Sequence, residues 1–182
     1  MQTSQTLDEH TLVHRAQTDA HAFGTLYDRY VQRVYRYCYY RTSSNPDAED
    51  LTAQIFLAAL EALPRYRQDG YFAAWLFSIA RRKVADFRRR APRTQVSLEE
   101  SILPPIHSDL AMDMEISQRR ERLLQLIQAL ADDERELIHL RYVAELSFAE
   151  MASALQRNEE AVKKSLYRLL GRLKQELEAD HG

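Results

Sequence analysis

Proline restricts the fold of this chain more than any other residue, because beyond the first turn of a helix it ends or kinks that helix. Three of the five prolines, Pro92, Pro104 and Pro105, lie in the segment APRTQVSLEESILPPIHSD, which shows no sustained periodicity. Elsewhere the chain has four glycines in 182 residues and is rich in Leu, Ala, Glu, Arg and Gln. That composition favours helices and leaves few of the tight turns that an all-β fold requires.

We therefore predict an all-α protein of two small helical domains joined by a flexible linker. The first domain covers residues 1–91, the linker residues 92–109 and the second domain residues 110–182. About eighteen linker residues at ~3.3 Å each span at most about 60 Å.

Apolar residues recur at spacings of three and four in both domains, which predicts helices. The expected helices of the first domain are 7–41 with a break near Asp19, 45–63 and 71–90. In the middle one, Asn45 is the predicted cap and Pro46 the first helical residue. The expected helices of the second domain are 110–130, 132–143, 147–155 and 158–178.

Charge and composition exclude several classes of protein. The net charge is −2, and no run approaches the roughly 18 apolar residues of a membrane span. The N-terminus lacks the basic and apolar regions of a signal peptide. A single cysteine, Cys38, excludes an internal disulfide and fits a cytoplasmic protein. His10 and His14 lack a third ligand nearby, so we expect no metal site and no cofactor.

The segment from Ser147 to Leu177 has the pattern of a helix-turn-helix. Ser147 and Glu150 match a capping box, and Asn158 can cap a second helix whose inner stripe is leucine-rich. A second helix that is amphipathic and basic matches the DNA-reading type, which enters the major groove. The plain alternative is a helical hairpin with a solvated charged face.

The segment Arg81–Arg93 holds seven basic residues and one acid, Asp86. On a helix, Arg81 and Arg88 fall on a stripe roughly opposite a core face that contains Leu76 and Val84. Guanidinium groups pair with phosphate, so the stripe suits a nucleic-acid backbone, and a solvated surface is the alternative. The preceding helix carries a narrow polar stripe that includes Asp47, Asp50 and Gln54, which looks like a docking edge for another protein.

In their order and spacing, three motifs resemble the sigma-70 family of bacterial transcription initiation factors, specifically the short extracytoplasmic-function (ECF) type. DAEDLTAQIFLAAL resembles the polymerase-binding motif, YFAAWLFSIARRKVADFRRR the promoter −10 segment, and residues 130–177 the −35-binding region. Gln156 stands where the family usually has Gly, and Arg157 where it usually has an aliphatic residue.

The resemblance implies a role for each motif, residue by residue. It places in the docking motif for the polymerase core Asp47, Glu49, Asp50, Leu51, Gln54 and Phe56. It places at the −10 element Tyr66, Arg67, Asp69, Tyr71, Arg81, Arg82, Lys83, Arg88 and Arg89. It places at the −35 element Glu159, Glu160, Lys163, Lys164, Ser165 and Arg168.

The function implied is that of a sigma factor, which binds core RNA polymerase through its β′ and β subunits and reads the −10 and −35 elements of promoter DNA. It also implies an anti-sigma factor that can hold the chain at the membrane, without insertion of the chain itself. We find no P-loop, nucleophile elbow or acid–base constellation and predict no enzymatic activity. The alternative is a stand-alone helix-turn-helix regulator that acts without polymerase. A DNA-processing enzyme is a weaker alternative, since this sequence lacks catalytic carboxylates in a metal-binding arrangement.

Overall fold

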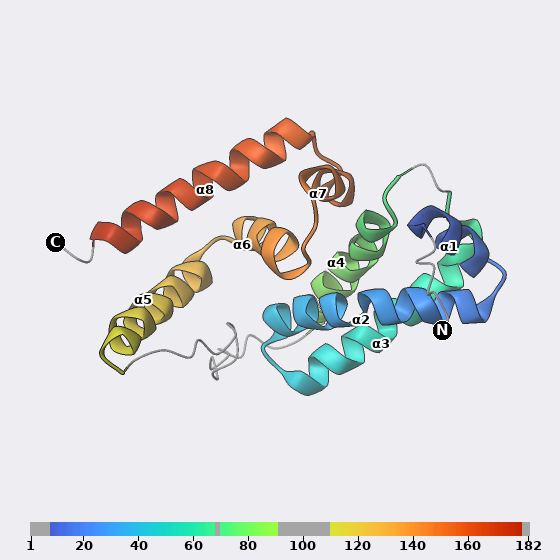
Figure 1. Cartoon of the computed structure of the whole chain (residues 1–182), viewed down its shortest axis with the longest axis horizontal. Helices are drawn as coiled ribbons and strands as arrows, with labels where there is room; N and C mark the ends of the chain where they lie inside the picture. Colours follow the sequence, from blue (N-terminus) through green and yellow to red (C-terminus); the bar gives the residue numbers. More distant parts are fainter. Residues whose placement is uncertain (1–7, 68–69, 91–109, 180–182) are drawn as a thin grey trace, which may run out of the picture.

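The computed structural model describes residues 8–67, 70–90 and 110–179, with side chains from residue 117 onward in the last range. These residues form helices and contain no strand, as the composition predicted (Figure 1). The predicted linker, residues 92–109, lies outside the described residues. No helix among them is long and apolar enough to cross a lipid bilayer.

The first half contains four α-helices and one 3₁₀ turn. Their bounds are α1 Glu9–Ala16, α2 Ala20–Thr42, α3 Asn45–Ala62, η1 Leu63–Arg65 and α4 Phe72–Arg90. The break predicted near Asp19 is confirmed, because the Asp19 side chain accepts from the His21 amide at 2.8 Å and starts α2. Helices α2, α3 and α4 pack on one another around Val34, Ile55 and Leu76, all fully buried.

The predicted cap of α3 is one residue out. Ser44, rather than Asn45, has extended backbone and accepts from the Asp47 amide at 3.4 Å. Asn45 is the first helical residue, and its side chain instead accepts a hydrogen bond from the Tyr35 hydroxyl at 2.9 Å. Pro46 is consequently the second helical residue, one position later than predicted. It is still tolerated there, because the N–H groups of the first turn have no partner within the helix.

The second half contains α5 Leu110–Ala129, α6 Asp132–Ile138, the π-helical turn η2 His139–Val143, α7 Phe148–Leu155 and α8 Glu159–Ala179. The predicted capping box is present: Ser147 Oγ accepts from the Glu150 amide at 3.2 Å, and the Glu150 carboxylate accepts from the Ser147 amide at 2.7 Å. Asn158 caps α8 as predicted, accepting from the Glu160 amide at 2.9 Å. The expected helix 132–143 changes to π geometry at His139.

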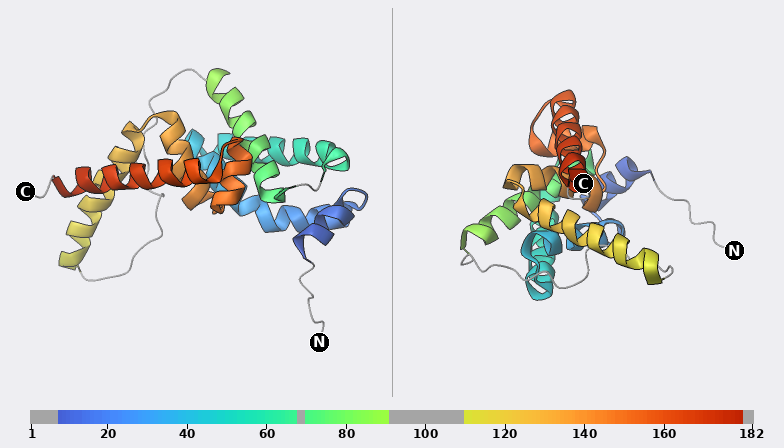
Figure 2. Two further views of the ribbon diagram at one scale, coloured as in Figure 1. Left: turned by 90° about the horizontal axis from the view of Figure 1, so that it is seen from above. Right: turned by 90° about the vertical axis from the view of Figure 1, so that its left-hand side faces the viewer.

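The two halves lie against each other. Helix α7 packs along α4 and η2 packs along α2, and Figure 2 shows this contact from two sides. One cluster of buried apolar residues includes members of both halves, such as Phe77 and Met151. The arrangement brings the helix-turn-helix next to the basic helix α4, a proximity that the sequence did not predict.

Candidate nucleic-acid and protein interfaces

One face of α3 is exposed along most of its length. Glu49, Asp50 and Gln54 lie on the surface, and Gln54 Nε2 donates to Asp50 Oδ2 at 2.6 Å. Asp47 is half-buried in the first turn. Leu51 and Phe56 are only 2% and 6% exposed and belong to the core. They fall on the inner side of the helix and offer little surface to a partner in this structure. Their role in polymerase binding stays a prediction.

Two exposed leucines extend the same face and were missed by the sequence analysis. Leu57 is 58% and Leu60 43% exposed, and they follow Gln54 at spacings of three and six residues. Tyr27 of α2 is also exposed, and the centroid of its ring lies 4.7 Å from that of the Phe56 ring in an edge-to-face arrangement. Helical spacing could have indicated these leucines, since residues three and four apart share a helix face.

The loop before α4 carries a cluster of aromatic rings. The ring centroid of Tyr66 lies 4.7 Å from that of Trp75 and 6.0 Å from that of Phe72. The Tyr71 side chain is half exposed. Gln17, which follows the last residue of α1, holds the loop by donating to the Tyr66 carbonyl at 2.8 Å. Arg67 is exposed, and Asp69 lies outside the described residues.

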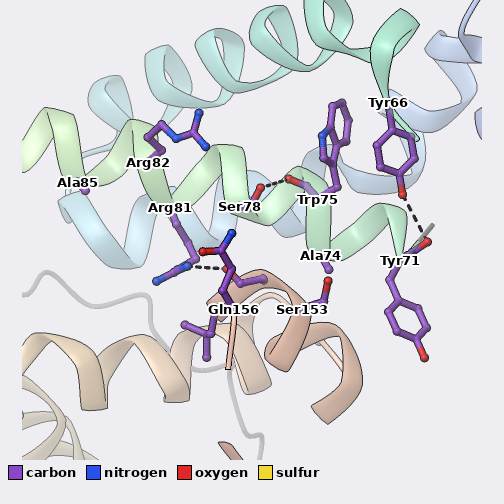
Figure 3. Close-up of a pocket in the computed structure, with 13 residues that line it drawn as sticks. Tyr66, Tyr71, Ala74, Trp75, Ser78, Arg81, Arg82, Ala85, Ser153 and Gln156 are labelled. Atoms are coloured by element: carbon purple, nitrogen blue, oxygen red, sulfur yellow. Dashed lines mark hydrogen bonds between the residues drawn. The ribbon is translucent and has the colours of Figure 1, made fainter. Parts of the chain in front are cut away.

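A cleft of about 460 Å³ opens between this loop, α4 and the end of α7. Figure 3 shows Tyr66, Tyr71 and Trp75 on one side of it and Ser153 and Gln156 on the other. Trp75 is half-buried and lines the cleft. Aromatic faces beside exposed Arg82 have the chemistry that single-stranded nucleic acids require, namely stacking surfaces with a nearby cation.

The arginines of α4 are not the uniformly free stripe that the sequence predicted. Arg81 Nε donates to Glu136 of α6 at 2.8 Å and its Nη1 to the Ala154 carbonyl at 2.6 Å. Arg88 pairs with Asp132 of α6, and Arg89 pairs with Asp86 of its own helix. The prediction of free guanidinium groups is therefore wrong for these three. Helix α6 supplies the acids for Arg81 and Arg88, and Asp86 of α4 itself supplies the acid for Arg89.

Two further residues of α4 keep the predicted exposure more closely. Arg82 is exposed and Lys83 is half-buried, and neither makes an ion pair within the described part of the chain. With Arg90, which is also exposed, they are the cations of α4 that make no ion pair with another described residue.

The ion pairs centre on a partly buried cluster. Glu136 is 7% exposed and accepts from the Tyr37 hydroxyl at 2.8 Å, and it also faces Arg41 at 3.4 Å. Burial, with Glu136 nearby, raises the pKa of Tyr37 well above its usual value. Burial alone would raise the pKa of Asp132, but the hydrogen bond from Arg88 and the charge of Arg41 together lower it.

His139 lies next to this cluster and stays neutral. Burial, with the charges of Arg41 and Arg135, lowers its pKa to about 3. Its ring lies 5.7 Å from that of Tyr40. A neutral imidazole avoids adding a third positive charge beside the two arginines.

The helix-turn-helix has the predicted form. Gln156 takes a left-handed conformation (φ 53°), and the Arg157 amide donates to the Ala152 carbonyl at 2.9 Å, which closes the turn. The inner stripe of α8, from Val162 to Leu173, is buried.

The candidate DNA-reading residues of α8 differ in accessibility. Glu159, Glu160, Lys164 and Arg168 are exposed. Lys163 is half-buried between Glu160 at 3.5 Å and the Phe148 ring at 5.6 Å. Ser165 is also half-buried and accepts from Arg157 at 3.0 Å, so Arg157 of the turn belongs to this surface although the sequence analysis did not include it.

Comparison with known proteins agrees with this geometry. Residues 26–94 match Sigma-70 region 2, and residues 120–173 match Sigma-70, region 4. The chain is 38% identical over 164 residues to the ECF RNA polymerase sigma factor BldN of Streptomyces coelicolor, covering 86% of this chain and 61% of that protein.

Two other relatives match most of their own length. ECF RNA polymerase sigma factor ShbA of Streptomyces griseus is 34% identical over 181 residues, covering 90% of this chain and 92% of ShbA. The structure of CnrH in complex with the cytosolic domain of CnrY aligns with a TM-score of 0.65 at 25% identity, covering 94% of this chain and 98% of that one. With both regions present in the family's order, the chain belongs to the sigma-70 family, as an ECF sigma factor.

Proposed function

We propose that the chain binds core RNA polymerase and directs it to a promoter by reading two DNA elements, and that it acts as a binding subunit in the cytoplasm and not as an enzyme. The observation that carries the proposal is the presence of three separate surfaces in the family's order: the exposed face of α3, the aromatic loop with α4, and the helix-turn-helix. Its relatives BldN and ShbA are ECF RNA polymerase sigma factors.

The docking surface for the polymerase core is the α3 face that runs from Asp50 through Gln54 to Leu57 and Leu60. It combines a carboxylate and an amide with two exposed leucines, and interfaces commonly place such an apolar centre inside a polar rim. A stand-alone regulator has no need of this surface, and therefore its presence favours the polymerase subunit over that alternative.

The −10 surface is the cleft beside Tyr66, Tyr71 and Trp75, together with Arg82 and Lys83. Opening a duplex costs stacking energy, and a site that stacks an extruded base recovers part of it. Tyr71 is half exposed at the mouth, which suits it to that role. Gln17 supports the loop from behind through its hydrogen bond to Tyr66.

The −35 surface is the exposed side of α8. Lys164 and Arg168 lie one turn apart and suit phosphate or guanine, while Glu159 and Glu160 can accept from cytosine. Arg157 and Ser165 form a linked pair at the turn. An inhibitor protein that covers these surfaces is a further proposed partner, supported by the structure of CnrH in complex with the cytosolic domain of CnrY.

The test is transcription in vitro. Purified chain is mixed with core polymerase and a library of promoter fragments, and transcripts absent with core alone are expected. Asp50→Lys should reduce core binding without changing the thermal denaturation curve, because Asp50 is exposed. Lack of a complex between the wild-type chain and core would refute the proposal, whereas tight operator binding without polymerase would support a stand-alone regulator.

A further inference from the structure

Helix α1 is joined to the loop before α4, although it lies outside the residues that match Sigma-70 region 2. That match begins at residue 26, whereas α1 ends at Ala16 and Gln17 follows it. Leu12 and Val13 are each 2% exposed, so the inner side of α1 belongs to the core. The helix packs on α2 and α4, at the end of the bundle where α3 leads into the loop (Figure 1). Because it is packed into the core, α1 can fix the position of the segments that it contacts.

The first connection from α1 is the Gln17 side chain. Its Nε2 donates to the Tyr66 carbonyl at 2.8 Å and to the Leu63 carbonyl at 3.3 Å. Leu63 begins the η1 turn and Tyr66 follows its last residue. An amide has two N–H donors, so one side chain holds both ends of the turn that leads into the loop. The position of the Tyr66 ring against Trp75 therefore depends on Gln17, 49 residues earlier in the chain.

The second connection runs through Glu9 at the start of α1. Both carboxylate oxygens of Glu9 accept from the Tyr30 hydroxyl, at 2.7 and 2.9 Å. Burial, together with this hydrogen bond, raises the pKa of Tyr30, so its hydroxyl stays a donor. The Tyr30 ring packs edge-on against Phe72 with 5.4 Å between centroids, and the Phe72 centroid lies 5.5 Å from that of Trp75. Both connections thus end at the aromatic rings of the cleft, one at Tyr66 and the other at Trp75.

We infer that α1 is a positioning element of the −10 cleft, in which Gln17 and Glu9 hold the aromatic rings in the arrangement that receives an unstacked base. Neither residue is among those that line the cleft, so both act through the rings. A site whose walls are already in place binds more tightly, because the apparent dissociation constant is the intrinsic constant divided by the competent fraction. That the ligand is single-stranded DNA rests on the proposed function, whereas the positioning of the rings does not.

Ring positioning is measured first without DNA or polymerase. Trp75 is the single tryptophan of the chain, so its fluorescence reports on the cleft. Gln17→Met removes both donors with little change in size, and Gln32→Met makes the same replacement at an exposed position of α2. At a temperature where circular dichroism shows both variants to be folded, acrylamide should quench Trp75 more strongly in Gln17→Met, and as in the wild type in Gln32→Met.

Glu9 offers a control within one position. Glu9→Gln keeps an oxygen that accepts from the Tyr30 hydroxyl, whereas Glu9→Leu removes it, and both variants lose the same negative charge. Quenching of Trp75 should therefore be stronger in Glu9→Leu than in Glu9→Gln. If Glu9→Leu lowers the melting temperature but leaves the quenching in the folded state unchanged, Glu9 serves stability alone and its positioning role is refuted.

Binding is measured next with a mixed-sequence 20-nucleotide single strand. Gln17→Met should bind about threefold to tenfold more weakly than Gln32→Met, the range expected for loss of hydrogen bonds to the loop. Affinity for a duplex of the same sequence should be equal for the two variants, because α1 lies outside the proposed duplex-reading surface of α8. Equal quenching of the two variants, or equal affinity for the single strand, would overturn the inference.

The two proposals fail separately. If the wild-type chain yields no polymerase-dependent transcripts while Gln17→Met exposes Trp75 and weakens single-strand binding, the sigma function is refuted and the positioning role is supported. If transcripts appear but the two methionine variants behave alike, the function stands and the positioning role is refuted.

Discussion

The two faces of α3 lead to a specific prediction. Replacing a leucine by alanine should weaken polymerase binding on the exposed face and lower the folding stability on the buried face. Leu57 is 58% exposed, and burying a whole leucine side chain contributes about 1.5–3 kcal/mol. Covering the exposed part against polymerase therefore contributes at most about 1–2 kcal/mol. Leu57→Ala should weaken core binding about 5- to 20-fold and leave thermal stability unchanged.

Leu51 provides the matched comparison one and a half turns away. It is 2% exposed, so Leu51→Ala leaves a cavity and should cost about 2–5 kcal/mol of folding free energy. At about 2–4 °C per kcal/mol for a chain of this size, the melting temperature should fall by about 4–20 °C.

Two measurements separate these effects. Circular dichroism records thermal denaturation, and competition against a labelled chain measures binding to core polymerase. Core binding by Leu57→Ala equal to that of the wild type would refute the proposed docking face. An unchanged melting temperature for Leu51→Ala would refute the assignment of Leu51 to the core.

Three further predictions concern the second half of the chain. Gln156 holds a left-handed conformation that disfavours non-glycine residues, so Gln156→Gly should raise the melting temperature by about 1–4 °C, and a fall would show that its side chain outweighs the strain. The pKa of His139 is lowered to about 3, against about 6.5 in the unfolded chain, so below pH 6.5 the unfolded state binds more protons and the free energy of unfolding falls by up to about 1.4 kcal/mol per pH unit. In urea denaturation between pH 6.5 and 5, His139→Leu should remove this slope. An unaltered slope would contradict the lowered pKa of His139. Lys164→Ala and Arg168→Ala should each reduce, by about 1, the slope of log affinity for duplex promoter DNA against log salt concentration. Lys174→Ala, near the C-terminal end of α8, should leave this slope unchanged. Equal slopes for the three variants would show that α8 does not contact the DNA.

Local features of the chain were predictable from the sequence. The break at Asp19, the capping box at Ser147 and the cap at Asn158 depend on residues no more than four apart, whose hydrogen bonds form wherever the helix begins. The cap of α3 was predicted one residue late, and the Asn45 side chain accepts from Tyr35, ten residues away, a contact that the local pattern does not contain.

The functional surfaces were predictable only in part. The order of the three motifs was enough to indicate the family. Helical spacing was enough to predict the exposed positions of Asp50, Arg82, Lys164 and Arg168. Spacing also restricts Leu51 and Leu57 to different sides of α3, but it does not say which side meets the core. That choice depends on the packing of α2 and α4 against α3.

By itself, the sequence determined an all-helical chain, the places where most helices start and stop, and the identity of its two conserved regions, since each depends on neighbouring residues or on motif order. Only the tertiary structure decided which arginines are available. Arg81 and Glu136 are 55 residues apart, and Arg36 and Glu145 are 109 apart, so no local pattern records their pairing. The pairing arises because the α4–α7 and α2–η2 contacts bring the acids of α6 and the segment after η2 next to the arginines of α4 and α2.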